Sequence, residues 1–513
     1  MTEPTTPQRR PISRARRIRI PPWLWMLGGA ALLVWGIATL RPSAAGPSVA
    51  AAPTALSVAT MTGSAGSAVE LAARPQLTPL GDALPNPNLP SSYTVQPGDG
   101  LSTIAARFGL SQEALMEANG ISDPNTVFAG QLLTLPTASQ LAASAQQLLP
   151  DSELVYGPAY GGFDLRAFVT ARRGYLANYQ EEVEGQPLNG VEIVERVSQR
   201  YSVGPRVLLA LLEYASGWVT DPSPSEIAQP AGLRYQASNG LFRQLSAAAT
   251  ALNQGYYDVA DGRSDQIVFA DGTVATVDPT TNAGSAALQM LFARHGTADS
   301  WGDALASDGY IASYRALFGD PWAYEVADLL PTALNQPALA LPWAAGEQWY
   351  FTGGPHGGWA DSASWAAIDF AAPDITGCYY SEHFVRSASA GRVIRSENGE
   401  VVVDLDGDGF VGTGWTLLYM HMAERVPVGT ELAVGDVIGR PSCEGGVSDA
   451  AHLHIARRYN GQWIAAAGAI PLTLGGWTTE GASQSYDGFL VRDGERKEAC
   501  ACRDDTLNGL VAP

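Results

Sequence analysis

The chain has 513 residues, of which 46% are hydrophobic, and this is more apolar sequence than one ordinary domain buries. Its formal net charge is −20, from 31 basic and 51 acidic residues. A body this acidic is repelled by phosphate backbones, so we expect no nucleic-acid partner. Four cysteines in this length exclude a disulfide-dense scaffold. We therefore expect a multidomain α+β protein.

The first 22 residues are rich in arginine and precede an uncharged apolar stretch at 23–40. A helix of that length spans about 27 Å, close to the roughly 30 Å of membrane hydrocarbon. The pattern predicts a cytoplasmic basic tail (1–22) and a transmembrane anchor (23–40), so that a single-pass membrane protein holds most of its chain outside the cytoplasm. Small residues at 43–45 support the alternative, secretion after cleavage of a signal peptide. Residues 41–92, rich in Ala, Pro and Ser, predict a disordered linker.

Residues 93–136 have the pattern of a small βααβ module. A short alternating strand begins at Tyr93 and breaks at Pro97, and two stretches of helical periodicity follow before a second short strand ends at Pro136. The unit resembles the lysin-motif family over its full length. That resemblance implies binding of N-acetylglucosamine-containing glycans such as those of peptidoglycan.

By the same resemblance, a shallow sugar groove lies between the two loops that flank the strands. Asp99 or Ser102 could instead simply cap the following helix, and for any one residue we favour the cap. For the module as a whole we favour glycan binding. The expected glycan-binding residues are Gly98, Asp99, Leu101, Ser102, Asn125 and Gly130.

Residues 150–335 predict a mostly α-helical middle domain. Apolar residues recur at helical spacing through 190–220, 241–257 and 282–293. Glu213 ends one of these stretches and is followed by Ser216, with Asn253 and Tyr256 downstream. This arrangement weakly resembles lysozyme-like lytic transglycosylases, which implies that Glu213 is a possible second catalytic acid. A structural glutamate bonded to a neighbour at the helix end is the alternative, and we favour it.

Four of the six histidines lie in the C-terminal part, in settings that favour chemistry. His452 and His454 flank one leucine in an apolar strand, so both imidazoles point to one face of a sheet. His356 follows two glycines and a proline, and His421 and Asp369 lie at apolar strands. Two histidines and one carboxylate, with water in the fourth position, make up a catalytic zinc site. The other two histidines, His295 and His383, predict ordinary core or surface residues.

This pattern resembles the lysostaphin-type zinc metallopeptidases of the beta-lytic branch, over 342–495. It carries the branch's Gly-Gly-Pro-His at 353–356, an aspartate thirteen residues later, and Tyr-Met-His and His-Leu-His at 419–421 and 452–454. The resemblance implies a mainly antiparallel β peptidase domain that cleaves peptidoglycan peptides, typically at glycine-rich or D-alanine-glycine bonds. It implies zinc on His356, Asp369 and His454, with His421 and His452 as the catalytic general base and transition-state stabilisers.

Two weaker patterns lie in the same region. Asp404, Asp406 and Asp408 have the spacing of the start of a calcium loop, but position twelve is Trp415, so we favour an acidic hairpin turn over calcium binding. The cysteines allow three pairings; Cys378 could pair with Cys443, and a disulfide or oxidised pair is expected at Cys500 and Cys502. Residues 496–513 predict a C-terminal tail.

Together these patterns predict a membrane-anchored cell-wall hydrolase, a zinc-dependent endopeptidase that a glycan-binding module targets to peptidoglycan. The alternative is a non-catalytic peptidoglycan-binding or scaffold protein of the cell surface. Missing metal ligands would favour that alternative, and under the beta-lytic spacing none is missing.

Overall fold

The computed structural model describes residues 92–513 with short gaps. The gaps fall at 97–98, 109–111, 125, 136–139, 143–146, 234–238, 361–362, 375 and 380. The predicted basic tail, the predicted span at 23–40 and the linker up to residue 91 lie outside the described residues.

The predicted transmembrane element needs correction. Among the residues that the structure describes, no helix is long and apolar enough to cross a membrane. The longest described helix, α7 (Leu241–Ala260), has 20 residues. It carries the polar side chains of Arg243, Asn253 and Asp258, so it is not apolar enough to span a membrane. This finding contradicts both the transmembrane part of the predicted fold class and the predicted single-pass membrane location.

The module at 93–136 has the predicted order of elements. Strand β1 (Ser92–Thr94) pairs antiparallel with β2 (Leu132–Thr134), and helices α1 (Leu101–Phe108) and α2 (Gln112–Asn119) lie between them in the chain. Its small core is made of buried apolar side chains from the helices and from the strands and their ends: Val95, Leu101, Ile104, Leu115, Met116, Leu133 and Leu135.

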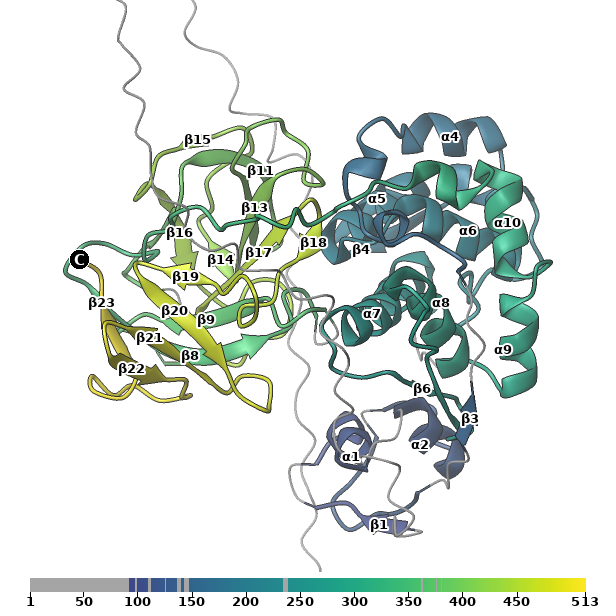
Figure 1. Ribbon diagram of the computed structural model, residues 1–513, viewed down its shortest axis with the longest axis horizontal. Helices are drawn as coiled ribbons and strands as arrows, with labels where there is room; N and C mark the ends of the chain where they lie inside the picture. Colours follow the sequence, from purple (N-terminus) through teal and green to yellow (C-terminus); the bar gives the residue numbers. More distant parts are fainter. Residues whose placement is uncertain are drawn as a thin grey trace, which may run out of the picture. The chain divides into compact units, whose positions relative to one another are not determined.

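A mostly helical domain follows, shown in blue to teal in Figure 1. Its helices are α3 (Asp151–Leu154), α4 (Leu165–Arg172), α5 (Gly190–Tyr201), α6 (Pro205–Ser216), α7, α8 (Ala283–Arg294), α9 (Ala298–Leu305) and α10 (Tyr310–Phe318), with 3₁₀ turns at Pro158–Tyr160, Tyr175–Asn178 and Pro321–Tyr324. Small sheets join β4 (Gln180–Val183) to β5 (Gln186–Asn189), and β3 (Gln140–Ala142) to β7 (Val274–Thr276) and β6 (Gln266–Val268).

Local sequence explains where the two central helices begin and end. Asn189 and Glu192 form a capping box at the start of α5, each side chain bonding the other residue's backbone N–H. Pro205 opens α6, where a missing N–H costs nothing, and Gly217 closes it with φ of 69°. The periodic stretch at 190–220 is therefore two helices with a tight turn between them.

The C-terminal domain is built on a nine-stranded sheet of described residues in which every pairing is antiparallel. The main path runs β15-β11-β12-β13-β17-β9-β8-β23, and β18 pairs with β17. The strands of this sheet are β8 (Gln348–His356), β9 (Ala367–Ala371), β11 (Gly391–Glu397), β12 (Glu400–Asp404), β13 (Trp415–Met420), β15 (Glu431–Leu432), β17 (Leu453–Tyr459), β18 (Gln462–Trp463) and β23 (Gly509–Val511).

Smaller sheets flank it. A three-stranded sheet has the order β10-β16-β14, and a four-stranded sheet has the order β19-β20-β21-β22. These strands are β10 (Val385–Arg386), β14 (Met422–Ala423), β16 (Val437–Pro441), β19 (Thr473–Leu474), β20 (Trp477–Gly481), β21 (Gly488–Arg492) and β22 (Glu495–Glu498).

The predicted C-terminal tail is part of this fold. Strand β22 lies in the four-stranded sheet, and β23 pairs with β8 at the edge of the large sheet. Leu510 in β23 is almost fully buried. The correction has a simple reason: three residues of strand give no periodic signal, and their partner lies more than 150 residues away.

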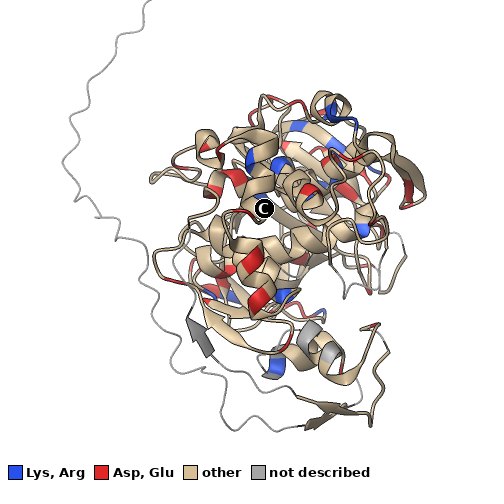
Figure 2. Cartoon of the chain, turned by 90° about the vertical axis from the view of Figure 1, so that its right-hand side faces the viewer, with Lys and Arg blue, Asp and Glu red and all other residues tan. Residues whose placement is uncertain are grey.

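Buried residues of the helical domain and of the sheet domain pack together in one apolar cluster. Ala366 and Trp463 of the sheet domain belong to the same apolar cluster as the buried faces of α5, α6 and α7. Arg200 of α5 donates from Nε to Glu400 Oε1 over 2.6 Å, and both side chains are nearly inaccessible. Other acidic residues are spread over the helices, strands and loops of the described chain (Figure 2).

Candidate metal centre

The predicted metal ligands come from three adjacent strands of the large sheet. His356 ends β8, Asp369 lies within β9, and His454 is the second residue of β17. The register places His454 opposite Asp369 and Gly353 opposite Asp369. Because cross-strand neighbours lie about 5 Å apart, three residues separated by up to 98 positions share one point of the sheet.

Three donor atoms converge there. His356 Nε2 lies 2.9 Å from His454 Nδ1, and each of these nitrogens lies 3.3 Å from Asp369 Oδ1. Ligand atoms about 2.1 Å from a tetrahedral zinc ion lie about 3.4 Å apart. The three residues are also buried, with at most 9% of each exposed. The spacing is that of one face of a zinc coordination shell.

Hydrogen bonds to the backbone orient both imidazoles. His356 Nδ1 lies 2.8 Å from the carbonyl of Gly354, and His454 Nε2 lies 3.2 Å from that of Gly358. Since a carbonyl only accepts, each facing nitrogen is the donor, and the other ring nitrogen presents a lone pair to the centre.

The centre therefore collects negative and electron-rich atoms. Two nitrogen lone pairs face each other beside Asp369 Oδ1, which is buried and accepts no hydrogen bond from the described residues. A buried carboxylate oxygen without a donor is costly unless a cation or a hydrogen bond satisfies it. A zinc ion fits this donor set in number, chemistry and spacing.

His421 and His452 lie beside these ligands. Their ring centroids are 4.5 Å apart, and His452 Nε2 lies 3.7 Å from Asp369 Oδ1. His421 Nδ1 contacts the carbonyl of Glu444 at 3.1 Å, and His452 Nδ1 contacts that of Ala450 at 2.8 Å. As in His356, the nitrogen that faces the carbonyl is Nδ1 and is the donor, so both rings keep an accepting Nε2.

The backbone of His421 is held in an uncommon conformation. Its φ is 64°, in the left-handed region that side chains with a Cβ seldom adopt. The N–H and the hydroxyl of Ser442 both donate to the His421 carbonyl, over 2.7 and 2.9 Å. Strained residues that the surroundings fix in this way are frequent at functional sites.

Electrostatics set the charge of two of these groups. Burial alone would raise the pKa of Asp369, but the adjacent His356 and His452 rings outweigh burial and hold that pKa well below its ordinary value. Burial, together with His452 and His454, lowers the pKa of His421 to about 3. The carboxylate is thus ionised and the His421 ring neutral near pH 7.

Two features of the centre were not among the predicted site residues. Gly353 leaves room for the carboxylate, since a Cβ there would lie 2.6 Å from Asp369 Oδ2. Tyr486 stacks on the His356 ring, with centroids 4.1 Å apart, and has φ of 68°. The sequence signal for the tyrosine is its position before Asp487-Gly488, which is part of the branch pattern but does not indicate a contact with His356.

A disulfide braces the loop beside His421 and His452. Cys378 and Cys443 are bonded, and Cys500 and Cys502 form a second bond. Cys443 directly precedes Glu444, whose carbonyl contacts His421. Of the three pairings that the sequence leaves open, the structure has Cys378–Cys443 with Cys500–Cys502.

The other predicted sites are placed as follows. Asp99 accepts hydrogen bonds from Tyr93 and Gln96, Leu101 is buried in the module core, and Ser102 and Gly130 are exposed. Gly98 and Asn125 lie outside the described residues. Phe128, which the sequence reasoning passed over, is 71% exposed in the loop after residue 125, where an aromatic ring could contact a sugar.

Glu213 has the contacts of a turn cap. Its Oε2 accepts from the backbone N–H groups of Val219 and Thr220, each over 3.1 Å, and Oε1 accepts from the Thr220 hydroxyl. These contacts are those of the structural alternative that the sequence favours. His383 lies near the surface, 3.2 Å from Glu347, and His295 lies at the C-terminal end of α8.

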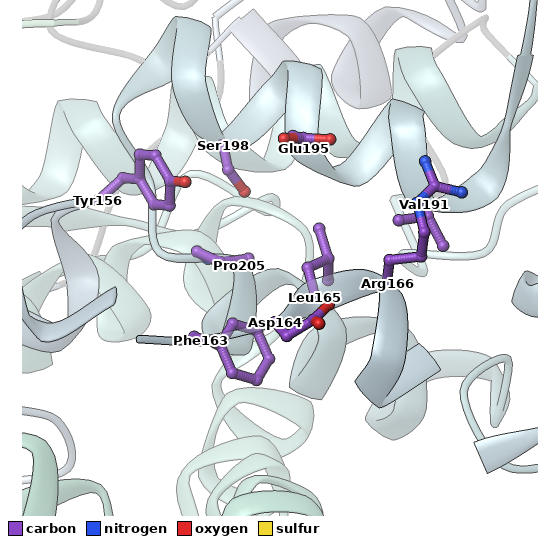
Figure 3. A pocket seen from close by; sticks show the side chains of 9 residues that line it. All are labelled: Tyr156, Phe163, Asp164, Leu165, Arg166, Val191, Glu195, Ser198 and Pro205. Atoms are coloured by element: carbon purple, nitrogen blue, oxygen red, sulfur yellow. The ribbon is translucent and has the colours of Figure 1, made fainter. Parts of the chain in front are cut away.

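The helical domain has a hollow of its own, with a volume of about 230 Å³ (Figure 3). Val191, Glu195 and Ser198 project into it from one face of α5, opposite Leu165 and Phe163. Its lining includes none of the metal-centre residues, so the hollow is separate from the candidate site.

Comparison with known proteins finds matches in two parts of the chain. Residues 147–332 match the family described as LasA, N-terminal domain, and residues 93–136 match the LysM domain family. Protease LasA of Pseudomonas aeruginosa (strain UCBPP-PA14) is 28% identical over 357 residues, which cover 66% of this chain and 79% of that protein. The N-acetylmuramoyl-L-alanine amidase XlyB of Bacillus subtilis (strain 168) is 38% identical over 85 residues, 16% of this chain and 27% of that protein.

Solved structures resemble parts of the chain. The M23 metalloprotease pseudoalterin, from the deep sea, is 23% identical and covers 32% of this chain and 96% of its own, with a TM-score of 0.27. The catalytic domain of lysostaphin from Staphylococcus simulans is 21% identical and covers 24% and 95%, with a TM-score of 0.18. The assignment rests on the sequence matches: the predicted lysostaphin-type metallopeptidase with a lysin-motif domain is confirmed.

Proposed function

We propose that this chain, a lysostaphin-type metalloendopeptidase with a LysM domain, binds zinc through His356, Asp369 and His454 and cleaves peptide cross-links of peptidoglycan. The observation that carries the proposal is the convergence of three donor atoms within 2.9–3.3 Å around a buried carboxylate oxygen that lacks a donor. When bound, zinc supplies Lewis acidity toward a water molecule and the scissile carbonyl.

The neighbouring histidines supply the proton chemistry. Both His421 and His452 anchor Nδ1 on a carbonyl, so Nε2 of either ring is able to take a proton from the attacking water. The ring that gains the proton becomes a cationic donor. It then stabilises the developing oxyanion or returns the proton to the leaving amine, and the second histidine supports it.

The substrate proposal is a glycine-rich or D-alanine-glycine peptide bond, as is typical of the beta-lytic branch. The LysM domain would hold the enzyme on the glycan while the metal centre reaches a peptide. We place this work outside the cytoplasm, after secretion, because peptidoglycan lies there and because the Cys378–Cys443 bond persists in an oxidising compartment.

The test compares full-length chain with and without metal on purified cell wall and on a soluble pentaglycine peptide. We expect one zinc per chain, loss of cleavage with a chelator, and recovery on addition of zinc. A chain that binds one zinc but cuts neither substrate would leave the wall-binding scaffold as the better explanation.

Glu213 is not part of this proposal, because its carboxylate is engaged by a turn. A direct measurement separates the two possibilities. If the helical domain is a lysozyme-like catalyst, wild-type chain releases anhydro-muropeptides or reducing sugars from glycan strands and Glu213→Gln does not. If Glu213 is structural, neither chain releases them.

A smaller proposal concerns calcium. Carboxylate oxygens of Asp404, Asp406 and Asp408 lie within 4.8 Å of one another. Burial, with Asp404 as neighbour, raises the pKa of Asp406 to about 6, as expected where acids crowd without a cation. The backbone contacts are also those of the hairpin turn that the sequence favours, since Gly409 N–H donates to Asp404. Calorimetric titration with calcium, compared between wild type and Asp406→Asn, distinguishes a bound ion from a turn.

A further inference from the structure

The segment between the first two proposed metal ligands packs against the helical domain. It runs from His356 to Asp369, and its described residues Ala363 and Ala366 are fully buried in the apolar cluster that contains α5, α6 and α7. Trp359 in the same segment lies under the guanidinium of Arg200, 5.4 Å from its ring centroid. The metal centre is therefore bordered by a loop whose position depends on another domain.

A continuous series of hydrogen bonds crosses that border. Asp261, just after α7, accepts from the hydroxyl of Ser364 over 2.9 Å. The Ser364 carbonyl accepts from Gly358 N–H over 3.1 Å, and the Gly358 carbonyl accepts from His454 Nε2 over 3.2 Å. His454 Nδ1 in turn faces the centre. Three hydrogen bonds thus connect a carboxylate of the helical domain to a metal ligand.

Asp261 itself lies at the surface, but Ser364, Gly358 and His454 are buried. Ser364 is 0% exposed, so its hydroxyl does not meet bulk water while Asp261 is in place. Gly358 is held from its other side by Trp463, because a Cβ at this glycine would lie 2.6 Å from the indole ring. The backbone N–H of Trp463 donates to the hydroxyl of Tyr257, which lies in α7 one turn before Asp261. The last turn of α7 therefore fixes Gly358 from two directions.

We infer that Asp261 and Ser364 are positioning residues of the metal centre: through Gly358 they orient His454, so in this chain the helical domain contributes to the geometry of the zinc site. The inference deepens the proposed zinc site and rests on it. A carbonyl partner fixes the tautomer and direction of a metal-binding histidine, and loss of such a partner typically weakens metal binding about 10–100-fold.

The experiment measures zinc affinity of the full chain by competition with a chromogenic chelator, together with kcat and KM on a soluble peptide. Asp261→Ala and Ser364→Ala should each weaken zinc binding, by at most the about 10–100-fold that loss of the direct carbonyl partner would cause, and lower kcat more than they raise KM. The double variant should be no worse than the more affected single variant, because both remove the same series. Ser364→Thr, which keeps the hydroxyl, should stay nearer to wild type in zinc affinity than Ser364→Ala.

The control is Asp278→Ala, which removes a carboxylate of the helical domain whose hydrogen bonds go to Thr280 in its own turn and not to the loop. The metal-free melting temperature of each variant accompanies the affinities. Ser364→Ala removes a single oxygen and keeps the inference testable if Asp261→Ala does not fold.

Zinc affinities of Ser364→Ala and the control that agree within twofold would overturn the inference while leaving the zinc site intact. A wild-type chain that binds no zinc would instead overturn the proposed function itself.

Discussion

The sharpest prediction separates metal ligands from the histidines that work beside them. His454 and His421 are both buried, and their ring centroids lie 6.1 Å apart. Only His454 places a ring nitrogen among the converging donor atoms, 3.3 Å from Asp369 Oδ1. His454→Ala and His421→Ala are therefore a matched pair with different expected defects.

The magnitude follows from the number of ligands. Zinc bound by a folded protein site is worth about 10–16 kcal/mol, and with three protein ligands each supplies about 3–5 kcal/mol of that. His454→Ala should weaken zinc binding by about 10²–10⁴-fold, at about 1.4 kcal/mol per tenfold. His421→Ala should retain zinc and lose about 10²–10³-fold in kcat, because one group that serves the transition state is gone.

The assay is zinc content of the purified chains by mass spectrometry after dialysis against graded chelator, followed by turnover on purified cell wall. Wild type and His421→Ala should release zinc at similar chelator concentrations, and His454→Ala at far lower ones. Equal zinc retention by both variants would refute the ligand assignment, and zinc loss by His421→Ala would show that this histidine belongs to the coordination shell.

Three further outcomes are expected. Deletion of 93–136 should weaken co-sedimentation with insoluble peptidoglycan but leave turnover of a soluble peptide nearly unchanged; unchanged sedimentation would remove the targeting role. Glu153→Ala should cost about 3–5 kcal/mol in urea unfolding of the helical domain, because it strips a two-point ion pair from buried Arg206, and a cost under about 1 kcal/mol would contradict that. Burial, with Arg294 nearby, lowers the pKa of His295 to about 3 from 6.5; since the unfolded chain gains this proton first as pH falls, the contribution of His295 should lower stability by roughly 2–3 kcal/mol between pH 8 and 4.5. His295→Leu should make that part of the pH dependence disappear, as measured by urea unfolding at both pH values.

Sequence reasoning reached the metal centre because its ligands follow the geometry of strands. A period of two predicts that His452 and His454 point to one face, and both rings indeed approach the same oxygen of Asp369. Glycine before His356 predicts a close approach of the backbone, and Gly353 makes room for the carboxylate. Local chemistry at Asn189 and Gly217 sets the ends of α5 and α6, although the periodic stretch at 190–220 does not by itself divide the two helices.

What the sequence did not reveal was contact between distant segments. The hydrogen bond from Ser364 to Asp261 joins residues 103 positions apart, and neither residue type indicates a partner by itself. Likewise, the residues of β23 predict a tail until β8 is seen beside them. Such contacts depend on the tertiary fold, which no local period encodes.

The four histidines of the centre share one feature that explains this limit. Each anchors a ring nitrogen on a main-chain carbonyl, and none of the four anchors is a side-chain carboxylate. The carbonyls belong to Gly354, Gly358, Glu444 and Ala450. A carbonyl does not titrate, so the tautomers hold wherever the loops hold, but every residue type has one and the sequence gives no sign of it. A substitution can disturb these carbonyl contacts only by moving the loops that carry them. Side chains that fix those loops, such as Ser364 and Cys443, are therefore the positions where a substitution would alter the orientation of the histidines.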